Sequence, residues 1–388
     1  MKNSAMINQP DDFLFDPNPE IGGAIVPLIG APGSGKTNAG VNIVKQNFQS
    51  GHIGVWKGSK EAQWIALVAN DVPVKVWNHE SMEEFEAYVT AKGPEDDPME
   101  IDFNEHQVES CKTGEEMQAI EVDTWQDPEE LINNLDTDRV NVINVPGLAQ
   151  KTEFKHPKYF YMKTWKDILY EMKERRYLQY ITFFADEIND IAPPQQQAKN
   201  PYNKIVSDQL PPIYAQLRKN NVLMYGAGHA THDMHYTFWG VKSNARINMA
   251  GANIKHKLDP GIDQDIVNNL DRGEFVMSGY EKSRFALLKQ PKDLSWIGDE
   301  EDHYAEKFRL DWDAEVPDYL GEKKDAENDQ AVDKGQVILN QNQRLAYKLT
   351  QDPWSWTQDQ IAEFFDRDQS QVSRWIRDQK EKRAEAEA

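Results

Sequence analysis

The amino-acid sequence predicts an α/β fold with a largely parallel central sheet, followed by a small all-α domain. Three observations support this prediction. Apolar runs with the length of strands alternate with segments of helical spacing as far as about residue 290. A glycine-rich loop joins the first predicted strand to the first predicted helix, and a later strand ends in two carboxylates. Beyond them, the polar and charge-rich residues 320–334 are typical of a linker between domains.

The composition is that of a globular protein with room for more than one domain. The chain has 388 residues, of which 39% are hydrophobic and 28% charged, enough for a sizeable core. No apolar run approaches the roughly 18 residues of a membrane span, and the opening Met1-Lys2-Asn3 does not begin a signal peptide. We therefore expect a soluble, cytoplasmic protein. The single cysteine, Cys111, excludes an internal disulfide framework and a cysteine-based zinc cluster.

The formal net charge of −22 bears on possible partners. Phosphate contacts dominate the affinity of proteins for DNA, so a DNA-binding protein needs local positive charge. Overall acidity does not exclude DNA, because charge can be unevenly distributed, but it removes net charge as an argument for DNA. A protein from a salt-rich cytoplasm would show the same acidity, and the sequence does not decide between these explanations.

The glycine-rich loop at residues 30–37, GAPGSGKT, fits the phosphate-binding pattern G-x-x-x-x-G-K-[ST] at every fixed position. The apolar residues 25–29 before it predict a strand, and Val41 and Val44 after it lie on one face of a predicted helix. Glycines let backbone N–H groups converge on phosphate oxygens, and the helix presents its positive end to the same charge. The loop therefore predicts a P-loop NTPase that binds ATP and Mg²⁺. Its nucleotide-binding residues are Gly30, Gly33, Ser34, Gly35, Lys36 and Thr37.

Two of these residues have side-chain roles in such a loop. Lys36 would reach the β- and γ-phosphates, and the Thr37 hydroxyl would be a ligand of Mg²⁺.

The elements that follow the loop alternate in type. Residues 53–56 and 72–77 predict two strands, and Pro73 confines the second to a sheet edge or to the start of its pairing. Residues 81–89 predict a helix, with Ser81 as its cap.

Two segments have little pattern of this kind. The polar residues 1–20 predict a flexible arm. The acidic residues from about 93 to 138 predict a partly solvated insertion in the ATPase domain, which spans residues 21–319. Regular pattern returns with a predicted strand at 139–145 and an amphipathic helix at 165–177. The apolar face of that helix consists of Trp165, Ile168, Leu169 and Met172.

The apolar residues 181–185 predict a strand that ends in Asp186 and Glu187. In P-loop enzymes an Asp at the end of a strand helps to hold Mg²⁺. An adjacent Glu can orient and deprotonate the attacking water, which a pure nucleotide switch would not need. A buried strand that ends in acids is common by itself, but beside a P-loop the functional interpretation is favoured.

The next predicted strand, residues 221–229, brings polar residues to the same edge of the sheet. Its last residue, His229, is a candidate sensor of the γ-phosphate, or a histidine that is simply hydrogen-bonded in a loop. His232 and His235 follow, but three histidines without a matching carboxylate pattern make a weak case for a metal site.

Late in the domain, residues 273–279 and 284–288 predict a closing hairpin. Arg218 and Arg246 are candidate arginine fingers, which would act on the ATP site of a neighbouring subunit, because a guanidinium group suits the charge that develops on a transferring phosphoryl group. Each is otherwise an ordinary surface arginine.

Taken together, residues 22–290 resemble the HerA/FtsK superfamily of P-loop ATPases, ring motors that move double-stranded DNA. The resemblance is carried by the loop at 30–37, the Asp186-Glu187 pair and Arg218 before the strand that ends at His229. It implies that Lys36 and Thr37 bind nucleotide and Mg²⁺, Asp186 supports the metal, Glu187 is the catalytic base and Arg218 is the candidate finger. The family usually carries Gln at the position of His229. The long separation of loop and acid pair is explained by the acidic insertion.

The C-terminal residues 335–388 resemble a helix-turn-helix domain. Ile361, Ala362, Val372 and Ile376 fall where two crossing helices pack, although Asp366 replaces the glycine often found at the turn. The residue types that begin the second helix suit base edges and phosphates. These candidate DNA-binding residues are Gln369, Ser370, Gln371, Ser373 and Arg374. The alternative is a small helical domain that binds another protein.

The sequence therefore predicts an ATP hydrolase that moves double-stranded DNA as a homo-oligomeric ring, in particular the genome-packaging ATPase of a virus or mobile element. In a virus it would be cytoplasmic or associated with the virion. Two alternatives remain open. One is a nucleotide-switched DNA-binding regulator that does not translocate; the other is an ATPase whose last domain docks a capsid or other partner protein.

Overall fold

The structure is a computed structural model that describes residues 23–291 with internal gaps, and beyond them residues 307–311, 350, 357–358, 362 and 369–377. The gaps lie at residues 60–61, 83–85, 91–98, 101–105, 111–112, 146–156, 175–178, 193–200, 231–233, 236–237, 239–245, 253–263 and 278–281. The chain divides into two compact units, Met1–Pro317 and Asp318–Ala388. The predicted arm at 1–20 and linker at 320–334 lie outside the described residues.

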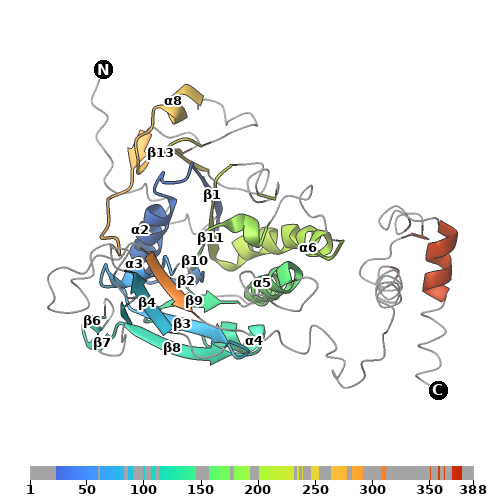
Figure 1. Ribbon diagram of the computed structural model, residues 1–388, viewed down its shortest axis with the longest axis horizontal. Helices are drawn as coiled ribbons and strands as arrows, with labels where there is room; N and C mark the ends of the chain where they lie inside the picture. The colour runs from blue at the N-terminus through green and yellow to red at the C-terminus, as the bar shows by residue number, and fades with distance from the viewer. Residues whose placement is uncertain are drawn as a thin grey trace. The chain divides into compact units, whose positions relative to one another are not determined.

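A ten-stranded sheet forms the centre of the first unit (Figure 1). Its strands, in their order across the sheet, are β14 (Lys282–Arg284), β13 (Glu274–Met277), β12 (Ile247–Met249), β1 (Ile25–Ile29), β11 (Val222–Gly228), β10 (Ile181–Ala185), β2 (Ile53–Lys57), β9 (Val140–Asn144), β3 (Val74–His79) and β8 (Ile120–Trp125). From β12 to β8 every pairing is parallel, and only the pairings of β13 with β12 and with β14 are antiparallel. The predicted α/β fold with a largely parallel sheet is thus confirmed. A closing hairpin is also present, but its second strand is β14 at Lys282–Arg284, whereas the prediction placed it at 284–288.

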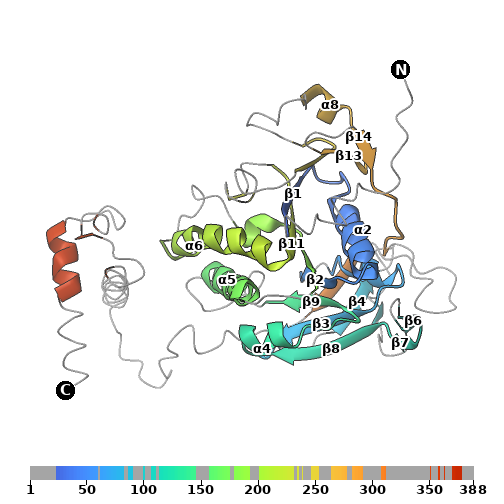
Figure 2. The same cartoon turned by 180° about the vertical axis from the view of Figure 1, so that it is seen from behind.

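Both faces of the sheet are covered, as a parallel sheet requires. Seven of its strands are buried along their whole length, namely β1, β2, β9, β10, β11, β12 and β13. One face packs against α2 (Lys36–Gln49) and the short α3 (Ile65–Val68), and the other packs against α4 (Pro128–Asn133), α5 (Pro157–Glu174) and α6 (Pro201–Leu217). Figure 2 shows α2 on one side of the strands and α5 with α6 on the other.

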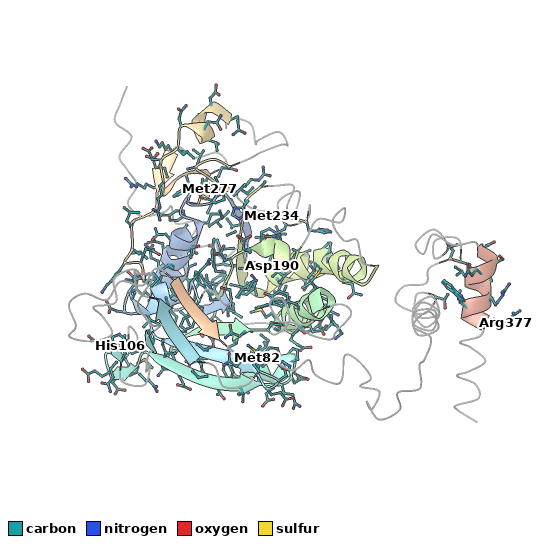
Figure 3. All side chains as sticks on the ribbon, viewed as in Figure 1. Met82, His106, Asp190, Met234, Met277 and Arg377 are labelled. Atoms are coloured by element: carbon teal, nitrogen blue, oxygen red, sulfur yellow. The ribbon has the colours of Figure 1, made fainter. Side chains whose placement is uncertain are left out.

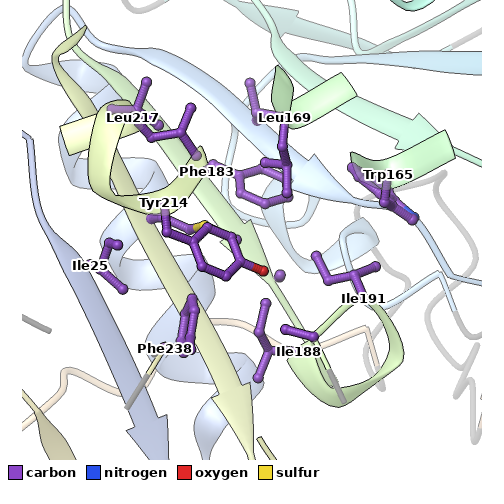
Figure 4. Close-up of a cluster of buried hydrophobic side chains, with 14 of the residues drawn as sticks. Ile25, Trp165, Leu169, Phe183, Ile188, Ile191, Tyr214, Leu217 and Phe238 are labelled. Atoms are coloured by element: carbon purple, nitrogen blue, oxygen red, sulfur yellow. The ribbon is translucent and has the colours of Figure 1, made fainter. Parts of the chain in front are cut away.

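The core beneath α5 and α6 shows how the sequence fixes this packing (Figure 4). The predicted apolar face of the helix at 165–177 is confirmed, because Trp165, Ile168, Leu169 and Met172 are all fully buried. They meet Phe183 of β10 and Tyr214 of α6. Burial of a large apolar side chain contributes about 1.5–3 kcal/mol, so this layer holds α5 and α6 firmly on the sheet.

Two small sheets lie outside the central one. β15 (Lys307–Asp311), β4 (Glu86–Thr90) and β5 (Met99–Glu100) form one, and β6 (Gln107–Glu109) with β7 (Glu116–Gln118) forms the other. The predicted helix at 81–89 is wrong where the structure describes it, because residues 86–90 are a strand. Its partner is β15, with Val89 opposite Phe308, and this distant pairing overrides the local helical spacing.

The acidic region from 93 to 138 contains part of the central sheet. β8 pairs with β3 along its whole length, from Val74–Ile120 to His79–Trp125. Its side chains alternate in exposure, with Ile120 and Trp125 buried at its ends. The acidic residues between them, Glu121 and Asp123, are partly exposed, and both pair with Lys75 of β3. Charged side chains of this kind suit an edge strand, so residues 120–125 belong to the fold and not to a solvated excursion.

A short extended segment, residues 285–290, follows β14 and is hydrogen-bonded to α2 and to the residue just after α3. Asn42 donates to the Ala286 carbonyl at 2.6 Å, and Asn38 accepts from the Leu288 amide at 3.3 Å. Asn70, just after α3, exchanges two hydrogen bonds with the Lys289 backbone. Three asparagines thus supply the partners that the backbone of this segment would find in a sheet.

In the second unit, residues 369–377 form a helix. Val372, Trp375 and Ile376 are buried on it, and Ala362 is also buried. The predicted packing residue Ile361 and the turn at Asp366 lie outside the described residues. Figure 3, which shows the described side chains, labels Arg377 at the end of this helix. In the described parts of both units, no helix combines the length and apolarity needed to traverse a bilayer.

Candidate nucleotide site

The loop between β1 and α2 has the backbone of a phosphate cradle. Gly33 and Gly35 have φ values of 77° and 101°, a region in which a side chain would be strained. The first helical hydrogen bond of α2 runs from the Ala39 amide to the Gly35 carbonyl. The amides of the first residues of α2 therefore precede the helical ladder and, with the positive end of the helix dipole, are available to an anion.

Three segments from later in the chain hold this loop in place. The Gly30 amide donates to the Gly228 carbonyl at the end of β11, and the Ala31 amide donates to the Ala250 carbonyl just after β12. On the other side, the Gly273 amide donates to the Ser34 carbonyl at 3.0 Å. The loop is therefore positioned before any ligand binds, an arrangement that reduces the ordering required on binding.

Lys36 lies folded across the loop. Its Nζ is 2.8 Å from the Gly30 carbonyl, 3.1 Å from the Ala31 carbonyl and 3.2 Å from Nδ1 of His229. Burial lowers the pKa of Lys36, and the carboxylates of Asp186 and Glu187 oppose that effect. A buried ammonium group at the mouth of an amide-lined loop suits a polyphosphate, as the motif predicts.

The acid pair lies directly beside the loop, although 149 positions separate Thr37 from Asp186 in the sequence. The Thr37 hydroxyl donates to Oδ2 of Asp186 at 2.9 Å, and Asp186 is 7% exposed. A hydroxyl and a carboxylate are oxygen ligands of the kind that Mg²⁺ takes, and the ion usually completes its shell with waters and substrate phosphates. The residues present therefore fit Mg²⁺ between Thr37 and Asp186.

Glu187 follows the strand in a strained conformation. Its φ of 49° is left-handed, and the short η1 (Ile188–Asp190) begins directly after it. Burial raises the pKa of Glu187; Asp186 and Asp190 add to the rise, while His229 and Lys36 oppose it. A carboxylate with a raised pKa is a stronger base, as a group that deprotonates water needs to be. Strained backbone of this type gathers at functional sites.

His229 connects the lysine to the glutamate. Its Nε2 lies 3.0 Å from Oε1 of Glu187, and its Nδ1 faces Lys36. Because an ammonium group can only donate, Nδ1 accepts and Nε2 carries the hydrogen that points to Glu187. The chain Lys36–His229–Glu187 therefore links the phosphate loop to the acid pair through the end of β11, the strand between them.

The structure brings together the loop, the acid pair and His229, but not Arg218. That residue begins η3 (Arg218–Asn220), and its carbonyl accepts from the Gly23 amide ahead of β1. It thus lies at the amino-terminal edge of the sheet, opposite the phosphate loop, and cannot contact the phosphate loop of its own chain. Arg246 directly precedes β12 and is 8% exposed.

Of the two other candidate histidines, the structure describes His235 but not His232. His235 is fully buried, and its amide donates to the Ala192 carbonyl.

Sequence reasoning missed Lys57 at the end of β2. Its Nζ lies 2.6 Å from the Asp186 carbonyl and 3.3 Å from Oδ2 of Asp190. The only signal in the sequence was a charged residue at the end of an apolar strand, Ile53-Gly54-Val55-Trp56-Lys57. Such a residue is usually solvated, whereas this side chain is 3% exposed.

The fold and the site define a P-loop NTPase of the α/β class, with the phosphate loop after β1, the acid pair after β10 and β11 between them. The sequence matches no known protein-family model and no curated protein.

Several solved structures are similar to this chain. The genome packaging NTPase B204 from Sulfolobus turreted icosahedral virus 2, in complex with sulfate, is 12% identical, with 69% of this chain and 98% of that chain covered and a TM-score of 0.32. VirB4 of Thermoanaerobacter pseudethanolicus is 11% identical, with 69% and 90% covered and a TM-score of 0.37. The N-terminal domain of zonular occludens toxin from Neisseria meningitidis is 12% identical, with 58% and 76% covered and a TM-score of 0.21. Likenesses at this level bear on the fold alone.

Proposed function

We propose that this chain is an ATP hydrolase that moves double-stranded DNA as a homo-oligomeric ring, and that its cargo is the genome of a virus or mobile element. The observation that carries the hydrolase is the contact of Thr37 with Asp186, which places Glu187 beside the phosphate loop. A protein that only sensed nucleotide would not need a strained, partly buried glutamate there with a raised pKa.

Each residue has a role in hydrolysis that follows from its place. Loop amides and Lys36 would bind the phosphates, and Lys36 would exchange its carbonyl contacts for phosphate oxygens. Thr37 and Asp186 would hold Mg²⁺, which when bound neutralises charge on the β- and γ-phosphates. Glu187 would orient the attacking water and accept its proton, while the Nε2–H of His229 holds the carboxylate toward the loop.

Movement of DNA is supported by the C-terminal helix. Gln369, Ser370, Arg374 and Arg377 are exposed on it, while its apolar residues are buried. A polar, basic face on a packed helix suits the phosphates and base edges of a duplex. The resemblance of residues 22–290 to DNA-moving ring motors extends this to translocation.

The first experiment measures the steady-state ATPase rate of the full chain with and without duplex DNA. We expect severalfold stimulation by DNA, and displacement of a triplex-forming strand from the duplex when ATP is hydrolysed. Hydrolysis that is indifferent to DNA would contradict the motor. Stimulation without strand displacement would instead support a DNA-binding regulator.

A second experiment tests the DNA-binding helix. We expect the double substitution Arg374→Ala and Arg377→Ala to abolish stimulation by DNA and to leave the rate without DNA unchanged. Lys163→Ala with Lys166→Ala is the matched control, because it also removes two positive charges, from α5. Equal effects of the two pairs would show that only overall charge matters, and unaltered stimulation in both would favour a partner protein as the ligand of this domain.

The ring is tested by mixing subunits. Because Arg218 lies opposite its own phosphate loop, it would have to act on a neighbour. Arg218→Ala and Glu187→Gln proteins should each be inactive, and a mixture of them should regain activity, since some interfaces then combine an intact Arg218 with an intact Glu187. An inactive mixture would rule out Arg218 as the finger and leave Arg246 to be tested in the same way.

A further inference from the structure

We propose that Lys57, buried behind the acid pair, is a positioning residue for hydrolysis: its ammonium group fixes the peptide that joins Asp186 to Glu187, and so aims both carboxylates. This inference rests on the proposed ATP hydrolase. Lys57 does not touch the phosphate loop itself, and it acts only through the backbone of the residues that do.

The ammonium group of Lys57 faces three polar groups. The Asp186 carbonyl lies 2.6 Å and Oδ2 of Asp190 lies 3.3 Å from Nζ, and the Tyr161 hydroxyl of α5 interacts electrostatically with the same ammonium. Two directed hydrogen bonds therefore hold the ammonium against the turn that follows β10. Burial by itself lowers the pKa of Lys57, but Tyr161, Asp190 and Asp186 together raise it above its ordinary value, so the group stays charged.

The contact with the Asp186 carbonyl controls the orientation of one peptide plane. In a trans peptide the C=O and the following N–H point in opposite directions. With its oxygen held by Lys57, this peptide directs the Glu187 amide to Oδ1 of Asp186, at 3.1 Å. The other oxygen of that carboxylate accepts from the Thr37 hydroxyl. Lys57 thus orients the carboxylate that would hold Mg²⁺ through a single rigid unit.

The same ammonium spans the turn that carries Glu187. Asp190, at the end of η1, donates its amide to the Glu187 carbonyl and accepts from Lys57 with its carboxylate. Lys57 therefore ties the first and last residues of the turn 186–190 together. Glu187 sits between them with a φ of 49°, a conformation that persists only when its surroundings impose it.

The decisive variant is Lys57→Met, which keeps the length of the side chain and removes its donors. We expect kcat for ATP to fall by at least ~30-fold while the Kd for a non-hydrolysable ATP analogue changes by less than about threefold, because misplaced catalytic groups lose rate and not ground-state binding. Lys75→Met is the matched control, since Lys75 also lies between two carboxylates, at 2.9 and 3.1 Å, but in the distant part of the sheet. It should leave both constants unchanged.

Removal of a buried cation can prevent folding, so Asp190→Asn provides a second measurement. It keeps the shape of the turn and weakens only one of the three contacts of Lys57. We expect kcat to fall by about three- to tenfold with the Kd for the analogue unchanged. A merely structural role would lower the fraction of folded protein without altering kcat per bound nucleotide, so rates are normalised to the number of analogue-binding sites.

Two failures are distinguishable. If the wild-type chain binds the ATP analogue but hydrolyses no ATP, the proposed function is wrong. If wild type hydrolyses ATP while folded Lys57→Met retains full kcat, the role given to Lys57 is wrong. If Lys57→Met does not fold, an unchanged kcat in Asp190→Asn overturns the proposal equally.

Discussion

The two halves of the central sheet treat buried polar groups in opposite ways. In the half formed by β9, β3 and β8, several such groups have fixed and complementary partners. Oδ1 of Asn141 accepts from Trp77 Nε1 at 2.9 Å, and Lys75 lies between Glu121 and Asp123 at 2.9 and 3.1 Å. These contacts satisfy hydrogen-bonding groups and leave no charge in an unfavourable state.

In the half formed by β1, β11 and β10, groups of the same types lie in surroundings that disfavour their charged forms. Burial lowers the pKa of Lys36 and raises that of Glu187. Glu187 also has a left-handed backbone and a second carboxylate directly before it. Residue type alone therefore does not distinguish the candidate site from the rest of the sheet. The candidate site is distinguished by ionisable groups whose pKa values are shifted by burial and by strained backbone.

The largest expected effect comes from exchanging one carboxylate in each half for an amide. Glu187→Gln should lower kcat for ATP at least ~100-fold, because the proposed general base is lost, while the affinity for an ATP analogue is retained. Glu121→Gln, which alters a carboxylate paired with Lys75, should leave kcat unchanged. The test is a steady-state ATPase assay together with analogue binding. A comparable loss of kcat in both variants would show that the two halves do not differ in this respect.

The next effect should appear in stability and not in rate. Asn141 is fully buried and also donates to the carbonyls of Gly54 and Asp136. Asn141→Ala leaves these groups unpaired and should lower the free energy of unfolding by about 3 kcal/mol, with kcat at 25 °C preserved. Urea denaturation measures the first and the ATPase assay the second. Asn269→Ala is the control, because that side chain is exposed; an equal loss there would contradict the assignment.

A third prediction concerns pH and the distant half alone. Burial lowers the pKa of His79 to about 4 from 6.5, and its Nδ1 accepts from the Ser81 amide. As pH falls, the unfolded chain binds this proton first, so the contribution of His79 to stability is complete above pH 6.5 and is lost toward pH 4. Between about pH 8 and pH 5 the loss should be about 2 kcal/mol.

That loss is measured by urea denaturation at several pH values. His79→Gln does not titrate, so it should flatten the pH dependence of stability in this range. Parallel curves for the variant and wild type would show that His79 is not protonated on unfolding.

The smallest effect should be a shift of the acid limb of kcat. Burial raises the pKa of Glu187, and His229 opposes that rise. His229→Gln removes the opposing group, so the limb, along which kcat falls as Glu187 is protonated, should move to higher pH by less than about one unit. The pH profile of kcat checks this. A shift to lower pH would mean that His229 does not stabilise the carboxylate.

The two halves of the central sheet also differ in how much of their structure could be predicted from the sequence. The phosphate loop and the acids at 186–187 were predictable, because each is a local motif whose spacing follows from its chemistry. Parallel strands end at a common edge, so the approach of His229 to the loop followed as well. These residues can be recognised from the few residues next to them in the sequence.

What could not be predicted depends on distant partners. The strand at 86–90 has spacing that suits a helix, and only β15 makes it a strand. The acidic residues at 121 and 123 resembled a solvated excursion because their partner, Lys75, lies on another strand. Lys57 could be placed only after β10 was known to lie beside β2. Asn38 and Asn42, weak helix formers, are explained only by the segment at 285–290.

The strand order also affects how the protein can fold while it is being translated. The phosphate loop is translated early, yet its supports at Gly228, Ala250 and Gly273 come much later. At a synthesis rate of roughly 5–20 residues per second, a ribosome needs on the order of ten seconds or more to supply them. During that interval β1 has neither of its neighbouring strands, β11 and β12, so the nascent chain exposes an apolar segment. The phosphate loop therefore reaches its supported conformation only when translation of this unit is nearly finished.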